Sequence, residues 1–269
     1  MSGSRAKSGR PDGLNRAAAL PTFAVASAAP RRAPRILVLD VGGAHVKAHA
    51  SHRPGEVRIP SGPAMTPDQM LRGVQQRLKG WKFDVVSIGY PGWVVRGKIR
   101  KDPQNLGPGW VDFDFERAFG RPTRIVNDAA MQAIGSYEGG RMLFLGLGTG
   151  LGSAMIVEGK LAPMELAHLP YKKGRTYEEY VGEAALLRLG GKKWRKEVGQ
   201  VIEILSAALG PDYVVLGGGN SRRLRKLSKG VRRGDNANAL IGGLRLWRQE
   251  WWPEEPGRRA VRAGSGPHS

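Results

Sequence analysis

Residues 142–157 read MLFLGLGTGLGSAMIV and give the strongest indication of the fold. Two apolar runs, Met142–Leu147 and Ser153–Val157, flank a glycine-rich turn, which predicts two strands joined by a tight connection. Residues 36–50 read ILVLDVGGAHVKAHA and repeat the arrangement, with an apolar run, a Gly42-Gly43 turn and a weaker alternating run. The chain therefore holds two similar openings, one in each half.

Helices and single strands follow each opening. Thr66 and Pro67 form a helix start, since threonine is a favoured N-cap and proline fits the first helical position. The pattern predicts strands at Val85–Ile88 and Thr123–Val126, a helix from about 129 to 137, another over Thr176–Leu189 opened by a capping box, and a last helix at about 237–250. This succession predicts a two-lobe α/β fold with duplicated halves rather than a barrel.

The composition limits the function classes. The chain has 269 residues, of which 41% are hydrophobic, so it is globular. No apolar run approaches the roughly 18–20 residues that cross a bilayer. The absence of cysteine excludes disulfides, thiol catalysis and cysteine-bearing zinc sites, and we expect no zinc.

The charge is the unusual property. Lys and Arg number 43 against 23 Asp and Glu, giving a formal net charge of +20, which attracts polyanions such as nucleic acid or a phosphate polymer. A solvated basic surface with no partner explains the same excess. We expect a disordered basic arm at 1–33, an N-terminal α/β lobe at 34–127, a C-terminal α/β lobe at 128–236, a helix at 237–252 that packs back toward the first lobe, and a flexible tail at 253–269.

Glycine turns after strands let backbone N–H groups approach phosphate oxygens. The chain has three such turns: Asp40-Val41-Gly42-Gly43, Gly148-Thr149-Gly150-Leu151-Gly152 and Gly217-Gly218-Gly219. Each alone could be an ordinary tight turn. None is a Walker loop, and the second enters a strand rather than the helix of a dinucleotide fingerprint. Together, at corresponding places in duplicated halves, they indicate a phosphate-binding protein.

These turns, with Asn127-Asp128 and Glu165-x-x-His168, occur in the order found in ROK-family sugar kinases, and the chain resembles most the polyphosphate glucokinase branch. The resemblance covers about Ile36 to Trp247. It implies an actin-like, hexokinase-type fold, two lobes with a cleft between them, that transfers a phosphoryl group to a hexose, expected to be glucose, at its 6-hydroxyl. The donor would be ATP, inorganic polyphosphate or both, with Mg²⁺.

The resemblance also implies residue roles. Asp128 would be the general base, since phosphoryl transfer to a hydroxyl needs a carboxylate to accept the proton; the alternative role is a helix N-cap. Asp40 would hold Mg²⁺ directly or through water. The sugar side would comprise Pro91, Gly92, Asn105, Asn127, Glu165, His168 and Glu179, with Glu178 as the alternative to Glu179, which the capping box already explains. The phosphate side would comprise Asp40, Gly42, Gly43, Lys47, Gly148, Thr149, Gly150, Gly217, Gly218 and Gly219.

Two positions depart from the family pattern. Ala44 stands where the family usually has threonine, so a hydroxyl donor to phosphate is lost, and Ala167 stands where glycine normally precedes the histidine. The loss at Ala44 bears on turnover rate or donor preference, and Ala167 crowds its turn slightly. Basic clusters that a polyphosphate chain could follow are 96–101, 172–175, 192–196 and 222–226.

Two rival functions remain open. A catalytically weak ROK-type sensor would bind sugar without turnover. A nucleic-acid-binding protein would use the positive charge, but the sequence has no recognition helix, stacking motif or zinc module, so we expect no sequence-specific binding of that kind. We further expect a cytoplasmic homodimer; the alternative of a secretory signal over 17–29 is disfavoured because Pro21 interrupts an alanine-rich stretch.

Overall fold

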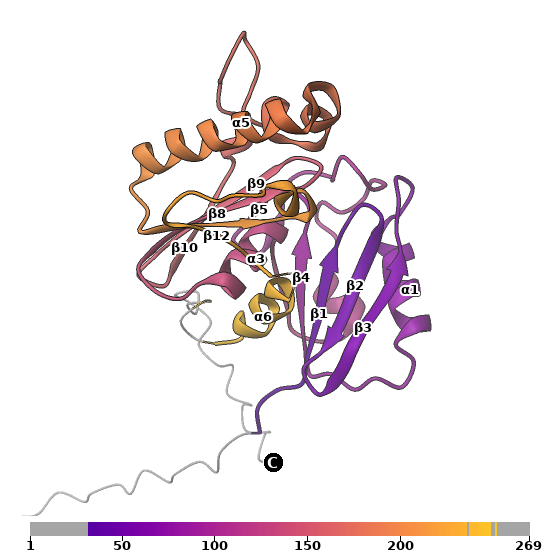
Figure 1. Ribbon diagram of the computed structural model, residues 1–269. Coiled ribbons are helices and arrows are strands. Elements are labelled where there is room, and N and C mark those ends of the chain that lie inside the picture. The colour runs from indigo at the N-terminus through magenta and orange to yellow at the C-terminus, as the bar shows by residue number, and fades with distance from the viewer. Residues whose placement is uncertain (1–31, 236, 249–250, 252–269) are drawn as a thin grey trace, which may run out of the picture. The chain divides into compact units, whose positions relative to one another are not determined.

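The structure is a computed structural model that describes residues 32–235, 237–248 and 251. From Pro34 onward the described residues form one compact unit that contains two mixed sheets (Figure 1). The predicted basic arm lies outside the described residues except for Arg32 and Ala33, and the predicted tail at 253–269 lies outside them entirely.

The first sheet has the strand order β3-β2-β1-β4-β7. Its strands are β1 (Ile36–Val41), β2 (His45–Ala50), β3 (Arg53–Pro60), β4 (Val85–Tyr90) and β7 (Thr123–Asn127). β1 pairs antiparallel with β2 and parallel with β4, which pairs parallel with β7. Both faces of β4 are buried, which is why its sequence does not alternate between apolar and polar residues.

The second sheet repeats this topology with the order β10-β9-β8-β11-β12. Its strands are β8 (Arg141–Leu147), β9 (Leu151–Val157), β10 (Lys160–Met164), β11 (Tyr213–Gly217) and β12 (Val231–Arg233). β8 pairs antiparallel with β9 and parallel with β11, as β1 does with β2 and β4. The predicted α/β fold with two similar halves is confirmed.

Two helices connect the sheets. α3 (Asp128–Ser136) contacts strands of both sheets, and α6 (Asn238–Arg245) contacts α3, β1 and β4. The helices cross in backbone contact, because a Cβ on Gly135 would lie 1.8 Å from the Asn238 carbonyl oxygen and one on Gly242 would lie 1.8 Å from that of Met131. Only glycine allows this approach.

Side-chain hydrogen bonds stabilise the same crossing of α3 and α6. The Arg245 guanidinium donates to the carbonyl oxygens of Ile134 (2.7 Å) and Tyr137 (3.1 Å), so it satisfies acceptors left free at the end of α3. The buried Ser87 hydroxyl on β4 donates to the Gly243 carbonyl at 2.7 Å and accepts from the Trp247 indole at 2.9 Å. The first sheet is thereby hydrogen-bonded to the last described helix.

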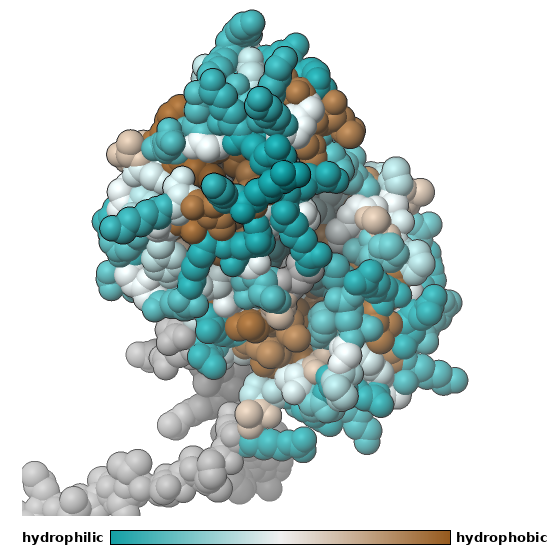
Figure 2. All heavy atoms as spheres, in the orientation of Figure 1, coloured by the Kyte–Doolittle hydropathy of each residue, from teal (hydrophilic) through white to brown (hydrophobic). Residues whose placement is uncertain are grey.

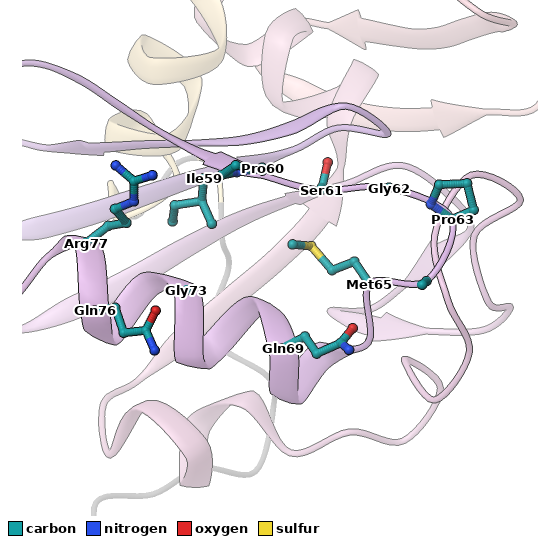
Figure 3. Close-up of a pocket in the computed structure, with 11 residues that line it drawn as sticks. Ile59, Pro60, Ser61, Gly62, Pro63, Met65, Gln69, Gly73, Gln76 and Arg77 are labelled. Atoms are coloured by element: carbon teal, nitrogen blue, oxygen red, sulfur yellow. The ribbon is translucent and has the colours of Figure 1, made fainter.

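The outer face of the first sheet carries α1 (Pro67–Arg77), which begins at the predicted Thr66 cap with both hydrogen bonds of a capping box. Gly73 lets the helix approach β3, because a Cβ there would lie 2.7 Å from Ile59. A hollow of about 500 Å³ between β3 and α1 is lined by Ile59, Met65 and glutamines of the helix (Figure 3). The loop beyond β4 contains the short hairpin β5 (Val94–Val95) and β6 (Lys98–Ile99), followed by α2 (Phe115–Phe119).

The outer helices of the second sheet correct one prediction. The expected single helix over Thr176–Leu189 is divided into α4 (Glu178–Val181) and the start of α5 (Glu183–Leu209), because Gly182 adopts an extended conformation. Gly190, at φ 73°, interrupts α5 again. The second segment of α5 buries one face, made of Trp194, Val198, Val201, Ile202 and Leu205, and it ends at Gly210 in the left-handed conformation.

The face of the molecule drawn in Figure 2 is mostly hydrophilic. Figure 2 shows hydrophilic residues over most of the visible face, with hydrophobic ones in separate small patches. Among the described residues, no helix is both long enough and apolar enough to cross a bilayer.

Candidate active site

The junction of β7 and α3 carries Asn127 and Asp128. Asn127 is the N-cap of α3: its side-chain oxygen accepts from the backbone N–H of Ala129 (2.9 Å) and Ala130 (3.3 Å), and its Nδ2 donates to the Gly92 carbonyl at 3.0 Å. The N-cap role that the sequence left open for Asp128 therefore belongs to Asn127. The same side chain ties the Pro91-Gly92 loop to this junction.

Asp128 occupies the first turn of α3 and retains partial contact with solvent. Protein atoms around the carboxyl group remove most of its hydration, and this burial raises the pKa of Asp128 to about 7, with smaller contributions from the negative charges of Asp40 and Glu165. One Asp128 oxygen accepts from the Ala129 N–H at 2.7 Å, which partly offsets the rise. A carboxyl group whose pKa is near neutrality is suited to accept and release protons.

The end of β1 carries Asp40, whose side chain is 13% exposed. The Lys47 ammonium, opposite it on β2, donates to the Asp40 carboxylate at 3.0 Å. Lys47, predicted to contact phosphate, is therefore bound to the residue predicted to hold the metal.

The first glycine turn brings a further predicted residue into the site. The Gly42 N–H donates to the His45 carbonyl at 3.0 Å, and the Ser61 hydroxyl donates to the Gly42 carbonyl at 2.6 Å. A Cβ on Gly43 would lie 3.1 Å from Asn105 Cβ. Gly43 thus makes room for Asn105, and its contact with the transferring phosphate stays a prediction.

Glu165 and His168 lie around the short 3₁₀ helix η1 (Leu166–His168). Their side chains are 53% and 68% exposed, with 4.0 Å between a Glu165 oxygen and His168 Nε2. Ser153 fixes this segment to β9, since its hydroxyl donates to the Met164 carbonyl and accepts from the Leu166 N–H. Burial raises the pKa of Glu165, and the Glu178 charge adds to the rise while His168 opposes it.

Glu178 is the residue that the structure brings to this group in place of Glu179. One Glu178 oxygen accepts from the Leu151 N–H at 3.0 Å. The same oxygen would lie 2.0 Å from a Cβ added to Gly150, so only glycine fits there. Glu179 is exposed and accepts from the Thr176 backbone at 2.8 Å in the predicted capping box. A helix start at Thr176 leaves the side-chain directions of neighbouring glutamates undecided, which is why the sequence did not separate them.

The second and third glycine turns lie side by side. β11 pairs with β8 so that Gly217 is opposite Gly146, and a Cβ on Gly218, at φ +77°, would lie 2.3 Å from the Leu147 carbonyl oxygen. In the 3₁₀ helix η2 (Gly219–Arg223), the Asn220 amide donates to the Gly148 carbonyl at 3.2 Å.

Open space remains beside both of these turns. A Cβ added to Gly148 or to Gly219 would meet no atom of a non-adjacent residue within 4 Å. Thr149 is exposed, and its carbonyl accepts from the Glu183 N–H. The backbone of the two turns is therefore accessible to a ligand at these positions.

Two of the predicted basic clusters meet beyond η2. A hollow of about 340 Å³ between α5 and residues 224–231 is lined by Arg195, Arg225 and Lys226 together with apolar side chains. Lys172 is instead paired with Glu197 at 2.7 Å. Asp128 lines neither this hollow nor the one beside α1.

No family model matches the chain. It is 30% identical over 162 residues to a polyphosphate glucokinase of Mycobacterium tuberculosis, a match that covers 55% of this chain and 60% of that protein. It is 31% identical over 159 residues to a polyphosphate glucokinase of Mycobacterium leprae, covering 54% of this chain and 48% of the relative. The chain thus spans about half to three fifths of the length of these curated relatives.

Among solved structures, the chain is similar to the inorganic polyphosphate/ATP-glucomannokinase of Arthrobacter sp. strain KM, with a TM-score of 0.68 and 23% identity over 78% of this chain and 96% of that one. A ROK-family glucokinase of Streptomyces griseus in complex with glucose and AMPPNP gives a TM-score of 0.65 and 17% identity, over 80% and 99% of the two chains. These likenesses show that the fold is the hexokinase-type, actin-like fold of ROK sugar kinases.

Proposed function

We propose that this chain is a hexose kinase that transfers a phosphoryl group from polyphosphate, ATP or both to the 6-hydroxyl of a hexose, with glucose as the expected acceptor. The observation that carries the proposal is the Asp128 carboxyl group, whose pKa is raised to about 7 at the start of α3 and which lies in the electrostatic reach of Asp40 and Glu165. The likeness to polyphosphate glucokinases and to a polyphosphate/ATP-glucomannokinase supports the same reaction.

Each residue of the proposed site has a separate part in the reaction. Asp128 accepts the hydroxyl proton while the hydroxyl oxygen bonds to the terminal phosphorus and the shortened donor leaves with the bridging oxygen. Asn127 keeps an Nδ2 hydrogen beyond its bond to Gly92, and Asn105, Glu165 and His168 present exposed polar groups to the sugar hydroxyls. Glu178 interacts electrostatically with Glu165 and accepts a hydrogen bond from the second glycine turn, so it takes the role first assigned to Glu179.

Beyond Asp40, Gly42, Gly43 and Lys47 of the first half, the phosphate side of the proposed site lies in the second half of the chain. The open space beside Gly148 and Gly219 leaves room for the donor next to this backbone, where the Gly148 N–H itself donates to the Gly150 carbonyl at 3.1 Å. Arg195, Arg225 and Lys226 lie beyond η2, where an anion longer than one phosphate would continue. This arrangement supports a polyanionic donor and does not separate ATP from polyphosphate.

The acidic residues present fit a metal ion shared with the donor. Among the described residues there is no group of three or more His, Cys, Asp or Glu that would hold a metal by protein ligands alone. Mg²⁺ needs no such cage, because it commonly binds one or two carboxylates plus substrate phosphates and water. Asp40 would hold the ion beside the donor, where the ion would neutralise phosphate charge. In this structure Lys47 pairs with the Asp40 carboxylate.

A coupled hexose-kinase assay tests the proposal. Purified protein is assayed with glucose, mannose and other hexoses, against ATP and polyphosphate, with and without magnesium. We expect hexose 6-phosphate with at least one donor and no product after chelation. Calorimetric binding of glucose without any product would instead support the sensor function, and absence of both would refute the proposal.

The rate should depend on pH in a defined direction. Asp128 accepts a proton only when it is ionised, so kcat/KM for the hexose should be constant well above pH 7 and fall about tenfold per pH unit below it. Initial rates between pH 5 and 9 at constant ionic strength check this. A profile that stays flat to pH 5 would show that a group with an ordinary carboxyl pKa, or none, accepts the proton.

Two finer expectations belong to the same proposal. We expect a homodimer, which sedimentation equilibrium measures directly, and a cytoplasmic location, which fractionation of the source cells measures. A monomer at micromolar concentration would contradict the first expectation without affecting the proposed reaction.

A further inference from the structure

A loop without regular secondary structure, residues 102–111, carries Asn105 to the first glycine turn. Asn105 is exposed, and its Cβ lies 3.1 Å from where a Cβ on Gly43 would stand. A loop of this length has considerable conformational freedom unless it is held at several points. The position of Asn105 therefore depends on what holds the loop.

One carboxylate closes this loop. Asp102 Oδ1 accepts from the backbone N–H of Trp110 at 2.8 Å and of Val111 at 3.3 Å, and Asp102 Oδ2 accepts from that of Gly109 at 3.2 Å. These three bonds join the first residue of the loop to its last three. They lower the pKa of Asp102, in opposition to its partial burial. The carboxylate is therefore the ionised form at neutral pH.

The closed end of the loop rests on the buried core of the first sheet. Trp110 is fully buried, its indole N–H donates to the Met65 carbonyl at 3.3 Å, and its ring lies 5.5 Å from that of Tyr90. The Gly107 N–H donates to the same Met65 carbonyl at 3.0 Å. The Met65 carbonyl thus accepts from the loop, whereas the Met65 side chain lines the hollow beside α1 (Figure 3).

The other sugar-side loop is tied to the same point. Tyr90, which immediately precedes Pro91 and Gly92, donates its hydroxyl hydrogen to the Lys101 carbonyl at 2.9 Å. Asp102 follows Lys101 directly. The Tyr90–Lys101 hydrogen bond therefore joins the start of the Pro91 loop to the start of the Asn105 loop.

We propose that Asp102 is a positioning residue for the sugar acceptor, because its carboxylate closes loop 102–111 and so places Asn105 against the Gly43 turn. The inference rests on the proposed hexose kinase function. Asp102 does not contact the sugar; it acts through Asn105. Its loss should therefore weaken sugar binding and leave donor binding unchanged.

Asp102→Ala tests this. We expect KM for glucose, and the calorimetric Kd, to rise about tenfold, with KM for the donor unchanged and kcat within about threefold of wild type. Asp102→Asn keeps one acceptor oxygen but turns an NH₂ toward a backbone N–H, so it should give an intermediate increase. Asp114→Ala is the matched control: Asp114 caps α2 by accepting from the Arg117 N–H at 2.9 Å, so its loss should lower stability without changing KM for glucose.

The double variant separates positioning from general stability. If Asp102 acts through Asn105, Asp102→Ala should add little to the rise in Kd already caused by Asn105→Ala. Full additivity, an unchanged Kd in Asp102→Ala, or an equal rise in Asp114→Ala would each overturn the inference. If the wild type binds glucose but phosphorylates no hexose, the proposed function fails while the binding measurements still decide the role of Asp102; if it binds no glucose, both fail.

Discussion

Asp128→Asn should lower kcat for hexose phosphorylation by about 10²–10⁴-fold, the range of a lost general base, while KM for the sugar changes little. The asparagine keeps the size of the side chain and the bond to the Ala129 N–H, so the loss reports on proton acceptance alone. The residual rate should also lose the fall below pH 7, because the group that titrates there is gone. Initial rates at saturating sugar and donor across the pH range measure both effects.

Stability provides the control for this variant. The folded-state pKa of Asp128 lies above its ordinary value, so the folded protein binds the proton more tightly than the unfolded chain. This contribution to stability is complete below about pH 4 and is lost as the pH rises through about 7. Asp128→Asn removes the charge, so its melting temperature at pH 8 should equal or exceed that of wild type. Activity retained in Asp128→Asn would refute the assigned base, and a lower melting temperature would contradict the burial of the charge.

Gly242→Val should destabilise the protein by about 3 kcal/mol, the upper end of the cost of overpacking. A Cβ at this position would lie 1.8 Å from the Met131 carbonyl oxygen, which belongs to the backbone of α3 and cannot rotate away. The two helices would have to separate, and with them the hydrogen bonds of Arg245 to the end of α3. Denaturant unfolding followed by circular dichroism measures the loss.

Gly199→Ala is the matched control for Gly242→Val. Gly199 is also a helical glycine, but no atom lies within 4 Å of its added Cβ, so alanine should be neutral or stabilising by up to about 1 kcal/mol. Equal losses in the two variants would show that the close crossing is not what makes Gly242 necessary. Because α3 carries Asp128, Gly242→Val should also reduce kcat at temperatures where it remains folded.

The strand–turn–strand unit that begins each half could be predicted from the sequence, because it depends on the chemistry of adjacent residues. Apolar runs give buried strands, and glycine allows the tight turn, so the pairings of β1 with β2 and of β8 with β9 follow from adjacent residues. The Thr66 capping box is local in the same sense. The strands β3, β10 and β12 were missed because each is an edge strand with few or no buried residues, so its sequence has no strong apolar pattern.

The site was predicted less completely, because its assembly depends on contacts between distant residues. The sequence showed that Asn127 and Asp128 follow a strand, but it could not show that Asn127 takes the cap and so leaves Asp128 free. It could not separate Glu178 from Glu179, because they differ in a contact between distant residues, the hydrogen bond from the Leu151 N–H to Glu178. No local pattern pointed to Asp102, whose partners are backbone N–H groups of an irregular loop.

The glycine crossing of α3 and α6 also bears on how the molecule would close around a substrate. Asp128 lies three residues before Met131 and seven before Gly135, so it stands about 5–10 Å along the helix axis from the crossing. If one sheet rotates relative to the other, the axis of rotation would pass near this crossing. A side chain close to the axis moves less than the loops far from it. The proton acceptor would then move less than Asn105 and Glu165, which belong to the two different halves of the chain.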